Sequence, residues 1–289
     1  MDFLRPATWA EALEAKAAHP GAVPIAGGTD VMVELNFDRH RPEALLDLNR
    51  VTDLEQWADD DTRIRLGAGV SYSRIIDELG HVLPGLAMAS RTVGSPQIRN
   101  RGTVGGNLGA ASPAGDAHPP LLATGAQIEV ESTRGTRTIA AEDFYIGVKR
   151  NALEADELIK AVVLPKARGP EQFAKIGTRN AMVISVAAFA IALDPEARTV
   201  GTGIGSAAPT PRRATDAEAF LAAELDWESR GAIPDDVVKE FGERVRRAAS
   251  PIDDVRGTAA YRLHSLAVMA RRTLGWAWAE LQDDQRKAS

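Results

Sequence analysis

Apolar and polar residues alternate with a helical period near the start of the chain. Thr8 followed by Glu11 forms a capping box, which predicts a helix that continues to about His19. The apolar face of this predicted helix consists of Trp9, Leu13 and Ala17. The chain is therefore expected to start with an amphipathic helix.

Two short apolar runs follow this helix. Residues 23–26 predict a buried strand that leads into a glycine pair, after which Thr29 can begin a helix that extends to Asn36. Residues 45–48 predict a second strand. Together these elements form a small α/β unit that ends near residue 52, in which helix N-terminal amides face a ligand.

Beyond this unit, short strands and helices mix without the regular alternation of a doubly wound sheet. This pattern favours an α+β subdomain. Strands are predicted at 63–67, 127–132, 137–140 and 158–164, with helices near 72–79 and 86–93. Proline, glycine and charge cluster at 165–170, which indicates a domain boundary there.

The pattern after this boundary predicts strands first and helices afterwards. The strands are expected near 171–177, 182–193 and 199–205, and the helices near 216–223, 235–249 and 258–281. No internal repeat is visible. The basic run at 244–247 is interpreted as the solvated face of a helix, because arginines at successive positions of a helical segment point to different sides.

Composition is that of a globular protein with two domains. The chain has 289 residues, of which 44% are apolar and 26% charged, enough for more than one core. A net charge of −6 argues against nucleic-acid binding. No signal peptide is visible at the N-terminus, and the longest apolar run is shorter than the roughly 20 residues that span a bilayer. A cytoplasmic location without a membrane span is expected.

The absence of cysteine restricts the chemistry of this chain. Iron–sulfur clusters are held by cysteine thiolates, so any such cluster must lie on another polypeptide. The five histidines are scattered and have no spacing typical of metal ligands. No metal site is therefore predicted here.

Two glycine-rich segments carry the strongest signal for a ligand, IAGGTD at 25–30 and SPQIRNRGTVGGNLGAASPAGD at 95–116. Paired glycines let a backbone turn tightly and bring its N–H groups close to phosphate oxygens. An isolated glycine pair is usually only a turn. Two such segments in one chain suggest a clamp that grips a diphosphate from two sides.

A third glycine motif is a decoy. Gly203, Gly205 and Ala208 form G-x-G-x-x-A after a predicted strand, the spacing of a dinucleotide-binding loop. Such a loop must open directly into a helix, whereas Pro209 and Pro211 follow here. This motif is therefore rejected as a cofactor site. No phosphate-binding loop with glycine, lysine and serine or threonine occurs either.

Five ordered blocks make the chain resemble the FAD-binding medium subunit of the molybdenum hydroxylases, the xanthine dehydrogenase and aldehyde oxidoreductase group. These blocks are AGGTD at 26–30, QIRNRGTVGGNLGAASPAGD at 97–116, KIGTR at 175–179, GSAAPTPRRA at 205–214 and DDVRGTAAYR at 253–262. The resemblance extends over nearly the whole chain.

The resemblance implies an α+β fold of the vanillyl-alcohol-oxidase type. FAD would lie between two subdomains, at about 1–52 and 53–168, which together form an FAD-binding domain. A C-terminal α+β domain at 169–289 would follow, with a three-stranded antiparallel sheet and helices. Asp254 and Arg256 in the last block are expected to tie the final helix to this domain.

The resemblance also implies which residues bind FAD. The first segment would wrap the diphosphate and adjacent sugar groups with Val23, Pro24, Ile25, Ala26, Gly27, Gly28, Thr29 and Asp30. The second would act from the other side with Thr103, Val104, Gly105, Gly106 and Asn107. Asp116 matches a carboxylate that contacts the cofactor, Ile159 a position that packs on the flavin, and Lys175 a basic residue near its ring.

Some of these residues also have structural interpretations. Asp116 could instead cap the helix that follows it, and Lys175 could be a solvated strand residue. Gly109 and Ala110, just beyond the second segment, could leave room for the flavin ring or form a tight turn in the core. No catalytic side chain is predicted, because flavin itself carries electrons.

The predicted function is that of an FAD-carrying electron-transfer subunit. By resemblance, partners would be a large molybdopterin subunit and a small subunit with 2Fe–2S clusters, assembled as a dimer of heterotrimers. FAD would pass electrons to NAD⁺ or another acceptor, with xanthine or a related purine as the leading substrate. The alternatives are a stand-alone FAD oxidase of the vanillyl-alcohol-oxidase type and a flavin-free interaction module.

Overall fold

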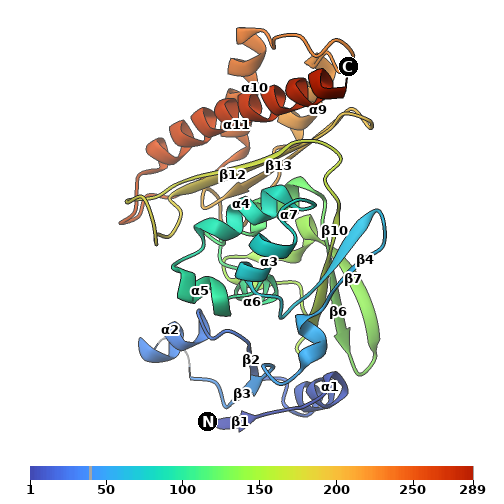
Figure 1. Cartoon of the computed structure of the whole chain (residues 1–289). Helices are drawn as coiled ribbons and strands as arrows, with labels where there is room; N and C mark the ends of the chain where they lie inside the picture. Colours follow the sequence, from blue (N-terminus) through green and yellow to red (C-terminus); the bar gives the residue numbers. More distant parts are fainter. Residues whose placement is uncertain (39–40, 289) are drawn as a thin grey trace.

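Three short parallel strands form the first part of the fold, at the bottom of Figure 1. The computed structural model describes residues 1–38 and 41–288. The strand order is β1-β3-β2, and the sequence pattern does not reveal β1 because its three residues are mostly exposed. The elements of this part are β1 (Asp2–Leu4), α1 (Trp9–Ala18), β2 (Val23–Ile25), α2 (Val31–Asn36), β3 (Ala44–Asp47) and the 3₁₀ helix η1 (Thr52–Glu55).

The capping box predicted before α1 is confirmed, with a small difference in geometry. Glu11 N–H donates to Thr8 Oγ1 (3.2 Å), and Glu11 Oε2 accepts from the N–H of Ala7 (2.7 Å), one residue earlier than in the usual box. Lys16 is buried, and its Nζ donates to two carbonyls of the loop after the helix. This lysine therefore ends α1 by binding the chain that leads to β2.

The segment around the first glycine pair differs from the expectation in two respects. β2 is half-exposed instead of buried, because Pro24 points to solvent at the edge of the sheet. α2 begins at Val31 after Asp30, so Thr29 does not cap it, and no side chain caps its first turn. Gly28 has φ of 74°, a conformation that favours glycine, and it turns the chain between β2 and α2.

A five-stranded antiparallel sheet forms the second part, in the order β4-β5-β10-β6-β7. The predicted strands at 63–67 and 127–132 coincide with β5 and β6. Its strands are β4 (Trp57–Asp59), β5 (Arg63–Gly67), β6 (Gln127–Ser132), β7 (Gly135–Ala140) and β10 (Leu158–Pro165), with a small pair β8 (Tyr145–Gly147) and β9 (Arg150–Asn151). The core of this part continues into the first, because Trp9 and Leu13 of α1 belong to the same apolar cluster as Ile64 and Leu66.

Six helices accompany this sheet in the described part of the chain, and three of them carry no clear sequence pattern. α3 and α4 were expected from their periodicity. α5, α6 and α7 are short helices with proline or glycine in the first turn, which mask the helical period. The helices are α3 (Tyr72–Glu78), α4 (Pro84–Thr92), α5 (Pro96–Arg101), α6 (Val104–Ala110), α7 (His118–Ala123) and α8 (Ala141–Phe144).

The third part, at the top of Figure 1, is an antiparallel sheet of three strands with helices on its outer face. It contains β11 (Glu171–Ile176), β12 (Ala187–Asp194), β13 (Thr199–Gly205), α9 (Thr215–Glu224), α10 (Asp235–Ala248) and α11 (Ala259–Ala288). A separate apolar core lies between this sheet and the three helices. Within the described residues, no helix is both long and apolar enough to cross a membrane.

The inner face of this sheet packs directly on the second part. A Cβ on Gly201 would lie 1.9 Å from the carbonyl oxygen of Ala123, and one on Gly203 would lie 2.0 Å from that of Pro119. These glycines therefore let α7 approach β13 at backbone distance. The next helix begins only at Thr215, so no helix opens directly from the G-x-G-x-x-A motif, as predicted.

Residues 182–186 lie outside β12, although the apolar run predicts a strand from 182. Met182 has φ of 50°, and Arg179 donates to its carbonyl, so the chain turns here instead of extending. The loop is fixed further on by Arg262 of α11, which donates to the carbonyl of Val186 (2.7 Å) and pairs with Asp254 (2.6 Å). Asp254 thus ties the last helix to its domain as expected, with Arg262 as its main partner in that helix.

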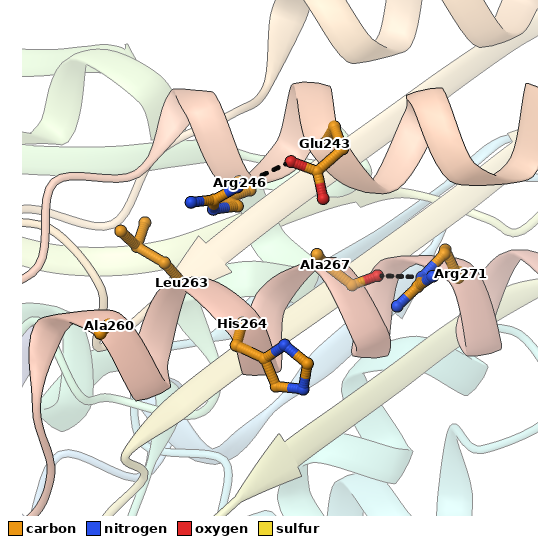
Figure 2. Close-up of a pocket in the computed structure, with 7 residues that line it drawn as sticks. All are labelled: Glu243, Arg246, Ala260, Leu263, His264, Ala267 and Arg271. Atoms are coloured by element: carbon orange, nitrogen blue, oxygen red, sulfur yellow. Dashed lines mark hydrogen bonds and ion pairs between the residues drawn. The ribbon is translucent and has the colours of Figure 1, made fainter.

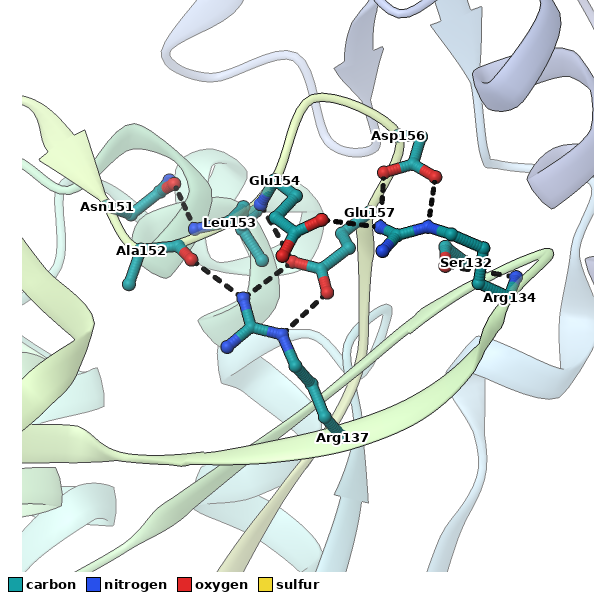
Figure 3. A network of polar contacts seen from close by, with 9 residues as sticks. All are labelled: Ser132, Arg134, Arg137, Asn151, Ala152, Leu153, Glu154, Asp156 and Glu157. Atoms are coloured by element: carbon teal, nitrogen blue, oxygen red, sulfur yellow. Dashed lines mark hydrogen bonds and ion pairs between the residues drawn. The ribbon is translucent and has the colours of Figure 1, made fainter.

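A polar network joins the β6–β7 hairpin to the chain before β10 (Figure 3). Arg134 pairs with Glu154 and with Asp156, and because Arg134 and Glu154 are each 57% exposed, that pair contributes little. Glu157 differs, because it is 5% exposed and receives two hydrogen bonds from Arg137 (2.6 and 2.8 Å). Hydrogen bonding from Arg137 lowers the pKa of Glu157, and this pair fixes the start of β10.

The carboxyl group of Glu171 gives a testable pH dependence at the junction between the second and third parts. It is 5% exposed, and Oε2 accepts from the N–H of Gly85 in α4 (2.9 Å). Burial raises the pKa of Glu171 from 4.5 to about 7, so the folded state holds a proton that the unfolded state releases. The contribution of Glu171 to stability must then fall as pH rises from 4.5 to about 7.

We expect Glu171→Gln to remove this dependence. Above pH 7 the variant should exceed the parent by about 3 kcal/mol in free energy of unfolding, and the two should converge at low pH. Denaturant unfolding across the pH range measures the difference. Glu228→Gln, at a side chain that is 78% exposed, is the control, and its difference in stability from the parent should not change with pH in this way. A difference in stability between Glu171→Gln and the parent that stays constant over this pH range would contradict the expectation.

Candidate functional site

The two glycine segments lie against each other. A Cβ on Gly27 would lie 1.8 Å from the carbonyl oxygen of Arg101, which belongs to the second segment. Asn49 reinforces this contact, since its Nδ2 donates to Ala26 O (2.9 Å) and its Oδ1 accepts from Arg101 Nη2 (3.0 Å). The predicted association of the segments is therefore present, but Gly27 serves the contact between two backbones.

Residues 103–107 of the second segment form the N-cap and the first turn of α6. Thr103 is its N-cap, and its Oγ1 accepts from the N–H of Gly106 (2.9 Å). Gly105 faces the interior, where an added Cβ would lie 2.5 Å from the carbonyl oxygen of Ala68. This glycine therefore allows α6 to pack on the turn after β5, and its contact with a cofactor stays a prediction.

The opposite face of α6 is open. Gly106 and Gly109 are exposed, and their spacing of three places them on one side of the helix. A Cβ on Gly109 would meet no atom within 4 Å, so this glycine is not part of a tight core turn. The first-turn amides of a helix attract anions. This face therefore offers room for a close ligand beside the start of a helix.

Asp116 and Lys175 form a buried ion pair between the second and third parts. Lys175 Nζ lies 2.6 Å from Asp116 Oδ2, and the two side chains are 10% and 8% exposed. Asp116 also accepts from Ser185 Oγ at Oδ1 and from Thr92 Oγ1 at Oδ2 (3.1 Å). Burial raises the pKa of Asp116, while Lys175 and these hydrogen bonds oppose the shift.

This geometry excludes both structural interpretations of the pair. Asp116 does not cap α7, whose N-cap is Ala117 without a side-chain bond. Lys175 is not solvated, since its Nζ also donates to the carbonyls of Thr92 (3.0 Å) and Val183 (3.1 Å). The contact of each with a cofactor stays a prediction.

Ile159 lies on β10 and joins the same neighbourhood. It is 8% exposed and borders an irregularity in the pairing of β10 with β6. The carbonyl of the next residue, Lys160, accepts from the N–H of Ala68 (3.0 Å), the residue against which Gly105 packs. Ile159 is thus held beside the second glycine segment.

The cluster around Asp116 also reaches the second segment. Gly115 packs against Asn107, because an added Cβ would lie 2.6 Å from Asn107 Oδ1. The structure therefore brings all the predicted residues into one connected region. Sequence reasoning missed the residues that connect them, since their roles arise only from contacts between distant segments. These connecting residues are Asn49, Ala68, Thr92, Arg101 and Ser185.

A hollow of about 320 Å³ lies elsewhere, between α10 and α11 (Figure 2). Its polar lining includes the Glu243–Arg246 pair (2.9 Å) and Arg271, whose Nε donates to Ala267 O. None of the predicted cofactor residues lines this hollow. Among residues 1–38 and 41–288, no group of three acidic, histidine or cysteine side chains could hold a metal ion.

Comparison with protein families divides the chain between the second and third parts of the fold. Residues 1–167 match the family described as "FAD binding domain in molybdopterin dehydrogenase". Residues 172–277 match "CO dehydrogenase flavoprotein C-terminal domain".

Several curated proteins are similar to this chain. The nicotinate dehydrogenase FAD-subunit of Eubacterium barkeri is 37% identical over 196 residues, which cover 64% of this chain and 66% of that protein. The nicotine 6-hydroxylase medium subunit of Paenarthrobacter nicotinovorans is 30% identical over 94% of this chain and 95% of its own. The putative xanthine dehydrogenase FAD-binding subunit of Escherichia coli is 29% identical over 96% of each.

Solved structures show the same fold. A chain of the carbon monoxide dehydrogenase from Hydrogenophaga pseudoflava that lacks the Mo-pyranopterin moiety superposes with a TM-score of 0.89 at 26% identity. A chain of the Cu,Mo-CO dehydrogenase in its cyanide-inactivated form gives 0.89 at 28% identity. Each comparison covers 97% of this chain and 98% of the other.

Removing one partner of the buried pair tests its contribution to the fold. Lys175→Met should leave the Asp116 carboxylate uncompensated and lower the free energy of unfolding by about 3 to 5 kcal/mol. The double variant with Asp116→Asn should lose less than the sum of the single losses, since neither charge then remains. Urea unfolding of the four proteins measures the coupling.

Arg198→Met is the matched control, because it breaks the Arg198–Glu228 pair at side chains that are 59% and 78% exposed. Its effect should stay below about 1 kcal/mol. Equal losses at the buried and exposed pairs would show that Asp116–Lys175 has no special weight.

Proposed function

Because this chain belongs to the family of FAD-binding domains of molybdopterin dehydrogenases, we propose that the connected region around α6 is its FAD site. The chain is the FAD subunit of a xanthine dehydrogenase-like oxidoreductase. The observation that carries the site is the open glycine face of α6, in a region whose contacts also include the first glycine segment, Ile159 and the Asp116–Lys175 pair.

Each segment has a role that its geometry supports. The backbone of residues 23–30 and the first turn of α6 would hold the diphosphate and adjacent sugar groups. Backbone N–H groups at the start of a helix can bind an anion even where no lysine or arginine side chain is available. Asn107 adds a side-chain amide that can bind ligand, and Ile159 an apolar surface for the ring. The residues present therefore fit FAD.

FAD, when bound, supplies the electron-carrying chemistry. The chain orients it and sets the local field. Asp116 and Lys175 neutralise each other's charge, and Ser185 and Thr92 hold the carboxylate in place. Lys175 thereby presents a fixed positive end of a neutral pair at the position proposed to lie near the ring.

We further propose a vanillyl-alcohol-oxidase-type arrangement, in which 1–168 form the FAD-binding domain with subdomains at about 1–52 and 53–168, and 169–289 form the C-terminal domain. The separate apolar core between β11–β13 and α9–α11 supports the second boundary. The single core shared by α1 and the β5 region indicates that the two subdomains fold as one unit.

The electrons would come from 2Fe–2S clusters on a small partner subunit, with substrate oxidised at molybdopterin on a large one. The absence of cysteine supports this division of work. The relatives are named as medium chains or FAD subunits, which favours a subunit over the stand-alone oxidase. We propose a purine such as xanthine as substrate, NAD⁺ or another soluble acceptor, and a dimer of heterotrimers.

Gly109→Val tests the FAD site. The protein should purify yellow with non-covalent FAD, preferred over FMN because the clamp suits a diphosphate. A valine at 109 has free space in the chain itself but projects from the proposed binding face, so FAD affinity should fall strongly while thermal stability is kept. Flavin titration and calorimetry measure the two effects.

Gly275→Val in α11 is the matched control, since it is also an exposed helical glycine with nothing within 4 Å. It should leave FAD affinity unchanged. Gly27→Val and Gly105→Val are less informative, because their side chains would collide with backbone and disturb folding. Normal FAD binding by Gly109→Val would show that FAD does not bind at this face of α6.

The division of chemistry between subunits gives a second test. The isolated chain should pass electrons from its reduced flavin to a dye acceptor but should not oxidise xanthine. Coexpression with the proposed large and small subunits should restore xanthine oxidation at equal stoichiometry. Substrate turnover by the isolated, metal-free chain would support the stand-alone oxidase instead.

A further inference from the structure

His118 is a buried histidine that the sequence motifs do not explain. It is 0% exposed at the start of α7, and its Nδ1 lies 2.8 Å from the hydroxyl of Tyr145. Burial lowers the pKa of His118 to about 3, with the backbone of Ser112 opposing the shift only in part. The ring is therefore neutral at physiological pH and must carry one proton on one nitrogen.

The partner of Nδ1 determines where that proton lies. Tyr145 is itself buried, and among the described residues its hydroxyl has no hydrogen-bond partner other than His118. If the hydroxyl accepted from Nδ1, its own hydrogen would be buried without an acceptor, which is costly. Tyr145 therefore donates to Nδ1, and the proton of the imidazole lies on Nε2.

Nε2 of His118 and Oδ1 of Asn107 approach the same point. A Cβ on Gly115 would lie 2.3 Å from Nε2 and 2.6 Å from Oδ1, so both atoms lie beside one Cα and Gly115 must lack a side chain. Both atoms are buried without a hydrogen-bond partner among residues 1–38 and 41–288, although the backbone of Ser112 lies near enough to the ring to raise its pKa. Because both atoms lie within 2.6 Å of one position, a direct hydrogen bond or one bridging water can join them.

We propose that His118 is a positioning residue for the cofactor: its Nε2–H donates to Asn107 Oδ1, directly or through one water, and so turns Asn107 Nδ2 outward. A protonated Nε2 can face only an acceptor, which fixes which end of the amide points inward. Asn107 is half-exposed while its Oδ1 is buried, so Nδ2 is the end that meets a ligand.

This inference rests on the proposed FAD site, where Asn107 belongs to the second glycine segment. Tyr145, His118 and Asn107 then form a chain of donors that runs from the core to an oxygen of FAD. Without His118 the amide can rotate and turn its oxygen toward the phosphate, which repels it. Because the ring stays neutral, the positioning should not vary between pH 5 and 8.

The experiment is a double-mutant cycle on FAD affinity in the full chain. His118→Leu should weaken FAD binding about tenfold to a hundredfold, the size expected for one unsatisfied buried polar group. The same change in an Asn107→Ala background should have less than a twofold effect. His118→Gln, which keeps a donor at a similar position, should recover part of the affinity.

Two outcomes would overturn the positioning role while leaving the FAD site intact. One is an equal loss of affinity in both backgrounds, which would make His118 a general packing residue. The other is unchanged affinity in His118→Leu. If the parent chain itself bound no FAD, the proposed function would fail instead.

A second measurement needs no cofactor. In ¹⁵N-histidine NMR of the FAD-free chain, with His118 assigned from the His118→Gln spectrum, we expect a proton on Nε2, none on Nδ1 and no titration from pH 5 to 8. Asn107→Ala should shift the Nε2 resonance. A charged ring, an Nδ1–H tautomer or an Nε2 signal indifferent to Asn107 would refute the arrangement.

Discussion

The buried pair of Asp116 and Lys175 is the interaction on which the relative placement of the parts depends. The rest of the contact surface between the second and third parts is lined largely by small residues such as Ala89, Ala188 and Gly203. Small side chains allow close approach but specify orientation poorly. A buried charge pair has one satisfactory geometry, because a shifted partner leaves an uncompensated charge in the interior. The pair thus fixes the three-stranded sheet against the region that surrounds α6.

Within that region, the glycines divide into two kinds with opposite functions. Gly27 and Gly105 face neighbouring backbone and make the segments meet, whereas Gly106 and Gly109 face outward and leave a helix surface bare. The motif T-V-G-G-N therefore encodes both packing and access in adjacent residues. Since successive helical positions point in different directions, a glycine pair at a helix start serves both needs only when one member faces the core.

The sequence predicts most of the sheets and the identity of the cofactor segments, because both are local. β5, β6 and β13 follow from alternation within five to seven residues, and the resemblance depends on contiguous blocks. The short helices α5 to α7 are not predicted from the sequence, because the prolines and glycines in their first turns resemble those of loops. The partners of Asp116 and the contact between Gly115 and Asn107 escape for another reason. These residues come from distant segments, and a contact between distant segments leaves no pattern of spacing in the sequence.

The electrostatics of the region follow from the same constraint. Asp116 is compensated by Lys175, His118 is neutral, and Arg101 is engaged with Asn49 at the surface. No unpaired buried cation is therefore present among these residues to attract a diphosphate. In the proposed FAD site, the charge of the diphosphate would instead be met by oriented dipoles, namely the amides of the α6 first turn and the side-chain amide of Asn107. Dipoles fixed by packing need no reorganisation when a cofactor binds. The precision of the site thus depends on whatever holds those dipoles in place, which makes the buried residues behind α6 as important as the glycines on its surface.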